Sequence, residues 1–313
     1  MLWYHRPRSK GLVFAAYTLA LAIVFTALLT RTSKAAAAQP KEIPLPVIMY
    51  HHILESSRLL GAYCITPAEL RSDFERIRQD GYTPVVVADL LDYVYNDVPL
   101  PEKPIMITFD DGYESNYAYA YPLLQEYGYK AVISIYGRCT DEFTVAADKH
   151  INYSHITWEE IREMASSGLV EFQNHTYDMH SNASGSRKGI QKLYSEDAIT
   201  YRQKLTEDVG KLQQEFVDNL GYAPTAFTYP FGYLEPAADE IIRDMGFLAS
   251  FSCEGLRTTG SLPAWSWRTT CSRSRRRRRS RPPESASRFR GQTPWSSGRR
   301  GEGSSHTASK SCS

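Results

Sequence analysis

The stretch Ile105–Tyr113 constrains the fold more than any other part of this 313-residue chain. Its apolar, partly β-branched residues follow Pro104 and stop at Asp110, Asp111 and Gly112, which predicts a short buried strand ending in a tight turn. In α/β folds, the carboxyl ends of parallel strands carry the functional groups. Two neighbouring carboxylates at such a place repel each other and require a cation, a shared proton or solvent. An ordinary solvated Asp-Asp-Gly turn is the alternative interpretation.

A second group of candidate ligands follows another strand-like run, Leu169–Asn174. His175 stands at the end of that run and His180 lies in the loop beyond it, and neutral imidazole suits zinc, cobalt or nickel. A histidine pair alone is more often a surface or packing feature than a pair of ligands. Together with one carboxylate of the Asp pair, however, the histidines make three protein ligands and leave a position for water, as in a catalytic zinc site.

These residues and a third motif resemble the polysaccharide deacetylase family, also called NodB-homology or carbohydrate esterase family 4 proteins. The family motif T-F-D-D-G corresponds to Thr108–Gly112, H-[ST]-x-x-x-H to His175–His180, and R-x-P-[YF]-G to Thr228–Gly232. The motifs occur in the family order, and the resemblance covers about residues 46–254. Thr228 departs from the pattern, because many members carry an arginine there that steadies the catalytic aspartate.

The resemblance implies a metal-dependent hydrolase that removes N-acetyl groups from a cell-surface polysaccharide, by cleaving a carbon–nitrogen bond that is not a peptide bond. The divalent metal, most simply Zn²⁺, would be held by Asp111, His175 and His180. Asp110 would act as the general base. The residues implied at the oxyanion and the substrate are Tyr113, Tyr229, Pro230, Phe231 and Gly232, with a backbone N–H near Phe231 at the oxyanion. The substrate would be an N-acetylated glycan, either peptidoglycan or an exported β-linked N-acetylglucosamine polymer.

Strands and helices alternate along the body of the chain, without a repeat of fixed period. The predicted strands are 46–50, 84–87, 105–109, 131–136, 169–174, 226–229 and 247–252. The predicted helices are 67–79, which Thr66 caps, 114–127, 157–168, which a Thr157–Glu160 capping box opens, 201–220 and 237–245. This order indicates an α/β fold, a distorted (β/α) barrel. The resemblance implies a NodB-like (β/α)7 barrel, here incomplete at its C-terminal end.

Two further histidines, His51 and His52, follow the first predicted strand. In the deacetylases that this chain resembles, an M-Y-H segment commonly opens the domain, so a histidine here is a candidate for the pocket floor. A buried histidine bonded to backbone is the alternative. Family members usually supply their catalytic acid from a late L-x-L-x-H motif, which is not found here, and His306 is the only histidine after His180. A glycan-binding pseudoenzyme of the same fold is therefore the second hypothesis.

Residues 1–40 are predicted to form a signal anchor and spacer. Three basic residues precede Gly11–Thr30, about 20 largely apolar residues that as a helix would cross a hydrocarbon core of roughly 30 Å. A secretory signal has a shorter apolar region of about 7–15 residues, although Ala35–Ala38 offers a cleavage site. We favour a single uncleaved span in the cell membrane at residues 11–30, with the domain at 41–254 outside. Cleavage would instead give a secreted protein.

The last segment, residues 255–313, differs in composition from the body. It contains fourteen Lys and Arg against two Glu, a net charge of +12, whereas residues 1–254 carry −11. Because it is poor in apolar residues, we expect a basic disordered tail. Its abrupt start favours a shift of the reading frame near codon 254. An arginine-rich tail can bind nucleic acid, but no specific nucleic-acid partner is expected. The body cysteines Cys64, Cys139 and Cys253 show no metal-ligand spacing.

Overall fold

The computed structural model describes residues 45–55, 58, 60–61, 63–184 and 186–252. All of these residues fall in one structural unit. The predicted anchor and spacer at 1–40 and the predicted tail at 255–313 lie outside them, so the predicted domain boundaries stay predictions. Within the part that is described, no helix is long and apolar enough to cross a membrane.

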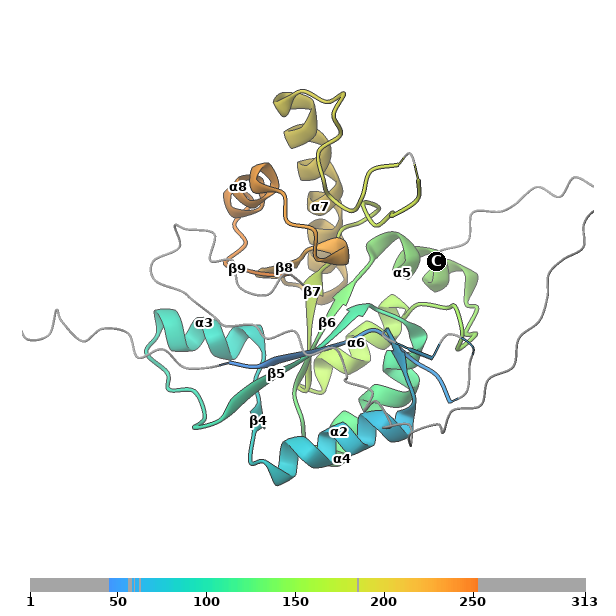
Figure 1. Cartoon of the computed structure of the whole chain (residues 1–313), viewed down its shortest axis with the longest axis vertical. Helices are drawn as coiled ribbons and strands as arrows, with labels where there is room; N and C mark the ends of the chain where they lie inside the picture. The colour runs from blue at the N-terminus through green and yellow to red at the C-terminus, as the bar shows by residue number, and fades with distance from the viewer. Residues whose placement is uncertain (1–44, 56–57, 59, 62, 185, 253–313) are drawn as a thin grey trace, which may run out of the picture. The chain divides into compact units, whose positions relative to one another are not determined.

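Parallel strands form the centre of the fold (Figure 1). The seven-stranded sheet runs in the order β1 (Val47–Tyr50), β5 (Pro104–Asp111), β6 (Ala131–Ile135), β7 (Val170–Asn174), β8 (Ala226–Thr228) and β9 (Ala249–Phe251), and β4 (Thr83–Pro84) also pairs with β5. A separate parallel pair consists of β2 (His52–Ile53) and β3 (Cys64–Ile65). Among the described strands, β1 and β9 end the sheet without pairing with each other. The parallel α/β architecture is therefore confirmed, in the form of a half-barrel.

Helices connect the strands of the large sheet, as the alternating pattern predicts, but the helices at 87–95 and 137–146 and the short strands at 52–53 and 64–65 were not predicted. The helices are α2 (Pro67–Gln79), α3 (Val87–Tyr95), the π-helix η1 (Asn116–Ala120) that continues into α4 (Tyr121–Tyr127), α5 (Gly137–Ala146), α6 (Trp158–Ser166), α7 (Ala198–Leu220), the 3₁₀ turn η2 (Pro230–Gly232) and α8 (Pro236–Asp244). The capping signals act as expected. Thr66 and Glu69 form a reciprocal capping box at α2, and Thr157 and Glu160 form another at α6.

The predicted strand at 84–87 is largely wrong. The strand ends at Pro84, and α3 begins at Val87. The Val86 N–H donates to the Asp89 carboxylate at 2.9 Å, which caps the first turn of α3, while Val85 still donates to the Ile105 carbonyl at 2.8 Å. The three valines are buried in either conformation, so this local capping, and not their β propensity, decides the backbone.

The two faces of the sheet differ in polarity because side chains alternate along each strand. Apolar residues such as Phe109, Ile133 and Phe172 pack with helical residues in the largest core cluster. The alternate positions carry polar groups that bond to one another: the Ser134 and Thr228 hydroxyls are 2.7 Å apart, and the Ala226 N–H donates to the Gln173 side chain at 2.8 Å. Continued toward the carboxyl ends, these alternate positions of β5 and β7 lead to the candidate site.

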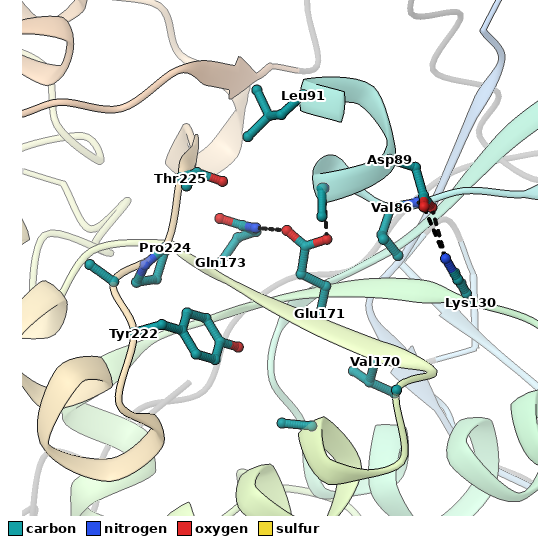
Figure 2. Close-up of a pocket in the computed structure, with 14 residues that line it drawn as sticks. Val86, Asp89, Leu91, Lys130, Val170, Glu171, Gln173, Tyr222, Pro224 and Thr225 are labelled. Carbon is teal, nitrogen blue, oxygen red and sulfur yellow. Dashed lines mark hydrogen bonds and ion pairs between the residues drawn. The ribbon is translucent and has the colours of Figure 1, made fainter. Parts of the chain in front are cut away.

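A pocket lies at the amino ends of the strands, away from that site (Figure 2). Its wall includes Glu171 and Gln173 of β7, together with residues of α3 and of the loop before β8. The Glu171 carboxylate accepts the Ala88 N–H at 3.0 Å and the Gln173 amide, and Lys130 pairs with Asp89 at 2.9 Å. These polar groups bond to one another and tie α3 to the sheet.

A buried carboxyl pair consists of Glu114, just after β5, and Glu160, in the first turn of α6. Glu114 is 6% exposed and interacts with Glu160, whose carboxylate also caps α6 and pairs with Lys149 at 2.5 Å. Burial, together with repulsion from Glu160 and a hydrogen bond to it, raises the pKa of Glu114 to about 7. Glu114 is therefore largely protonated in the folded protein at slightly acidic pH, whereas in the unfolded chain it ionises near its ordinary pKa of 4.5.

The substitution Glu114→Gln tests this pair. Between about pH 4.5 and 7 the folded state binds more protons at Glu114 than the unfolded state, so this group makes the free energy of unfolding fall as pH rises. The free energy of unfolding should therefore fall less between pH 5 and pH 8 in Glu114→Gln than in the wild type, by on the order of 1–3 kcal/mol. Urea denaturation of the metal-free proteins at pH 5 and pH 8 measures it. An identical pH dependence in the variant and the wild type would contradict the assignment.

Candidate metal centre

The three predicted metal ligands converge at the carboxyl ends of two strands of one parallel sheet. Asp111 is the last residue of β5, His175 directly follows β7, and His180 lies five residues further on. One ligand atom from each of them lies within 4.8 Å of the others. The Asp111 Oδ1 atom is 3.0 Å from His180 Nε2 and 3.3 Å from His175 Nε2. The sequence therefore predicted a group of residues that the fold does bring together.

The arrangement of these atoms suits a divalent metal. Asp111 Oδ1 is buried and makes no conventional hydrogen bond within the described part of the chain, although two imidazole nitrogens face it. In a tetrahedral site with bonds of about 2.1 Å, neighbouring ligand atoms are about 3.4 Å apart. The distances of 3.0 and 3.3 Å from Asp111 Oδ1 to the two imidazole nitrogens are close to this value. One carboxylate oxygen and two imidazole nitrogens also form a ligand set typical of zinc.

Hydrogen bonds support two of the three candidate ligands, His175 and Asp111. His175 Nδ1 lies 2.8 Å from the Thr228 carbonyl oxygen, so this nitrogen donates and Nε2 keeps its lone pair for a metal. His155 Nδ1 lies 2.9 Å from the Asp111 carbonyl. Thr228 stands where the family motif commonly has arginine. Its side chain bonds to Ser134 inside the sheet, and its backbone carbonyl supports the histidine.

The two aspartates have opposite electrostatic environments. Burial raises the pKa of Asp110, and the nearby His175, His51 and His180 only partly oppose this effect. Burial would also raise the pKa of Asp111, but His180 and His175 outweigh it and hold that pKa well below its usual range. Asp111 is therefore anionic, as a ligand must be, while Asp110 is the more basic carboxylate.

Three non-glycine residues at the site have a left-handed backbone. The φ angle is 71° at Asp111, 76° at Thr176 and 57° at Phe231. Such angles are unfavourable for residues with a Cβ, most of all for a β-branched threonine, and they concentrate at functional sites. Hydrogen bonds keep Thr176 in this conformation, since its N–H donates to Asn174 Oδ1 at 2.9 Å.

The predicted oxyanion and substrate residues occupy different positions. Phe231 is 39% exposed and its ring lies 4.6 Å from that of His180, while its neighbours Pro230 and Gly232 are buried in η2. Tyr113 is stacked between the rings of His52 and His155, and it interacts with Asp111.

Tyr229, by contrast, does not turn its side chain toward the metal ligands. Its ring packs on Phe227 in the second core cluster, and its hydroxyl donates to Asp239 at 2.5 Å. The Tyr229 side chain therefore packs in the core. In this motif, the Thr228 carbonyl contacts His175 and the Phe231 ring contacts His180.

The part of the chain that carries this site matches a known protein family. The sequence model of the family described as polysaccharide deacetylase matches residues 97–250. The solved structure of IcaB from Ammonifex degensii is 30% identical and superposes with a TM-score of 0.58, over 68% of this chain and 84% of that one. The chain belongs to the polysaccharide deacetylase family.

Characterised relatives in the polysaccharide deacetylase family carry a more specific name. Poly-beta-1,6-N-acetyl-D-glucosamine N-deacetylase of Escherichia coli (strain K12) is 29% identical over an alignment of 236 residues, which covers 69% of this chain and 35% of the relative. The protein of the same name from Staphylococcus aureus (strain MRSA252) is 25% identical over 204 residues, 65% of this chain and 66% of the relative. This chain thus spans about a third of the E. coli relative and slightly less than two thirds of the S. aureus one.

His51 is a further histidine at this deacetylase-family site. It lies between β1 and β2, close enough to Asp110 and Asp111 to act on both electrostatically, and its ring meets Tyr63 edge-on at 5.2 Å. The adjacent His52 is buried and bonds to Ser115 and to the Asn152 carbonyl. The buried histidine bonded to backbone is therefore His52, while a place for His51 at the pocket floor stays a prediction. In the sequence, these two histidines were indicated by their position directly after the first predicted strand.

Removing one ligand at a time tests the metal centre. We expect His175→Ala or His180→Ala to weaken Zn²⁺ binding by more than the roughly 10–100-fold that loss of an outer partner causes. Asp110→Asn should keep the metal, because Asp110 is not one of the three converging ligands. Metal analysis of the purified, dialysed proteins measures this, with the exposed His150→Ala as the control. Equal metal content in the wild type and in both ligand variants would rule out the assignment.

Proposed function

We propose that this chain is a metal-dependent N-deacetylase of an N-acetylated cell-surface polysaccharide. The observation that carries the proposal is the convergence of Asp111, His175 and His180 beside the buried, more basic Asp110. Of the two glycan classes predicted from the sequence, the names of the relatives favour a poly-β-1,6-N-acetylglucosamine over peptidoglycan.

The metal centre and Asp110 have separate roles in the attack of water on the acetyl carbonyl. Asp111, His175 and His180 would hold a divalent metal, most simply Zn²⁺, and the Thr228 carbonyl fixes the tautomer of His175. When bound, the metal would supply Lewis acidity toward the acetyl carbonyl and would lower the pKa of water at the site. Asp110 accepts the proton of the attacking water. Its burial favours this role, because a base is most effective when its pKa is raised toward the working pH.

Two further groups act on the substrate. The left-handed φ of Phe231 turns the backbone at the rim of the site, and its N–H is the candidate donor to the oxyanion that forms on the acetyl oxygen. His51 is the candidate donor of the proton that the leaving amine nitrogen requires. The C–N bond then breaks, and the products are acetate and a free amine on the sugar. Because His51 offers such a proton, a late histidine motif is not required, which argues against the pseudoenzyme hypothesis.

Acetate release tests the proposed function. We expect the full chain with Zn²⁺ to release acetate from β-1,6-linked N-acetylglucosamine oligomers. Asp110→Asn and His51→Ala should each reduce kcat by roughly 10²–10⁴-fold, as is typical for loss of a general acid or base. The exposed His150→Ala is the control. A chain that binds Zn²⁺ and the glycan but releases no acetate would instead support the pseudoenzyme.

We also propose that residues 11–30 anchor the chain in the cell membrane with the folded domain outside. The support for this proposal is the run of about 20 largely apolar residues that follows three basic residues. We expect the protein in the membrane fraction, released by detergent and not by salt, since Arg31 separates the apolar run from the cleavage site at Ala35–Ala38. A soluble protein whose N-terminus lies near Gln39 would show that the segment is cleaved.

A further inference from the structure

The loop that joins the two histidine ligands has little regular structure of its own. Thr176, Tyr177, Asp178 and Met179 connect His175 to His180 and belong to no helix or strand. A loop of this kind can aim two imidazoles at one ion only if its backbone is held by other parts of the fold. The groups that bond to its N–H and C=O groups are therefore as important for the site as the ligands.

One carboxylate from α7 binds two consecutive N–H groups of this loop. Asp208 Oδ1 accepts the Tyr177 N–H at 2.9 Å, and Asp208 Oδ2 accepts the Asp178 N–H at 2.8 Å. Each oxygen has its own donor, and hydrogen bonds to an ionised carboxylate are stronger than those between neutral groups. Asp208 lies about 30 residues beyond the loop, near the middle of a helix that begins at Ala198, so a rigid element carries it.

The other side of the loop is held by the start of α5. The Gly137 N–H donates to the Thr176 carbonyl at 3.1 Å, and the Arg138 N–H donates to the Tyr177 carbonyl at 2.9 Å. A Cβ on Gly137 would lie 2.8 Å from Leu212 of α7 and 2.9 Å from the Tyr177 ring, so a larger residue there would force these side chains to shift. The loop is thus fixed between α5, which supplies donors, and α7, which supplies the acceptor.

We propose that Asp208 is a positioning residue of the metal centre, which sets the distance between His175 and His180 by holding Tyr177 and Asp178. No motif of the sequence points to Asp208, and the two hydrogen bonds described for its carboxylate go to the backbone of the loop and not to the ligands. The inference rests on the metal site of the proposed function, but not on acetate release. Loss of an outer partner of this kind typically costs about 10–100-fold in metal affinity.

Zn²⁺ affinity and a Co²⁺ spectrum test the proposal on the full chain. Competition with a chromophoric chelator should show roughly 10–100-fold weaker Zn²⁺ binding in Asp208→Ala and a smaller loss in Asp208→Asn, which keeps one acceptor oxygen. The visible absorption of the Co²⁺-saturated protein should also change, because it reports the geometry of the ligands. Asp218→Ala is the matched control, since Asp218 is an exposed carboxylate on the same helix that bonds only to Gln214.

The outcomes separate this inference from the metal site itself. A wild-type chain that binds no Zn²⁺ would overturn both. If the wild type binds Zn²⁺ and a folded Asp208 variant matches it in affinity and Co²⁺ spectrum, Asp208 has no positioning role. Should Asp208→Ala fail to fold, Asp208→Asn decides the question, because it is nearly the same size and removes only one of the two acceptors. A lower melting temperature with unchanged metal binding would mean a structural role only, and would also overturn the proposal.

Discussion

The burial of two adjacent carboxylates at the end of the central strand determines most of what surrounds them. Every residue of β5 is buried, including Asp110 and Asp111. Water cannot stabilise both charges there, so positive or hydrogen-bonding groups from other elements must do so. His175 and His180 do this for Asp111, whereas Asp110 keeps a raised pKa. One strand end thus presents two aspartates with different chemistry.

The loops around the aspartates are held in conformations that they would not adopt alone. Asp111, Thr176 and Phe231 have left-handed backbones, and each lies at one of the three family motifs. Backbone strain of about 1–3 kcal/mol per residue persists only when neighbouring groups determine the conformation. Asn174, Asp208 and the start of α5 supply those groups for the histidine loop. The geometry of the site therefore depends on helices that carry no family motif.

The interior of the half-barrel explains how the chain tolerates Thr228 in place of arginine. A threonine there is small enough to bond to Ser134 across the sheet, and unlike arginine it adds no positive charge to the interior. The backbone of the same residue still supports His175. Backbone carbonyls are available whatever the side chain is, which makes this contact independent of the substitution. The support that arginine would give to Asp110 is replaced in part by the nearby histidines, His51 among them.

The alternation of strands and helices, the two capping boxes and the three candidate metal ligands could be predicted from the sequence, because they depend on periodicity, local hydrogen bonding and motifs that the chain carries contiguously. The end of the 84–87 strand was missed although its signal, the cap that Asp89 forms on Val86, is local. The sequence could not separate His51 from His52, and it could not show that Tyr229 packs in the core or that Asp208 bonds to the histidine loop. Each of these three depends on which element packs against a residue from far along the chain, and a local pattern contains no information about such contacts.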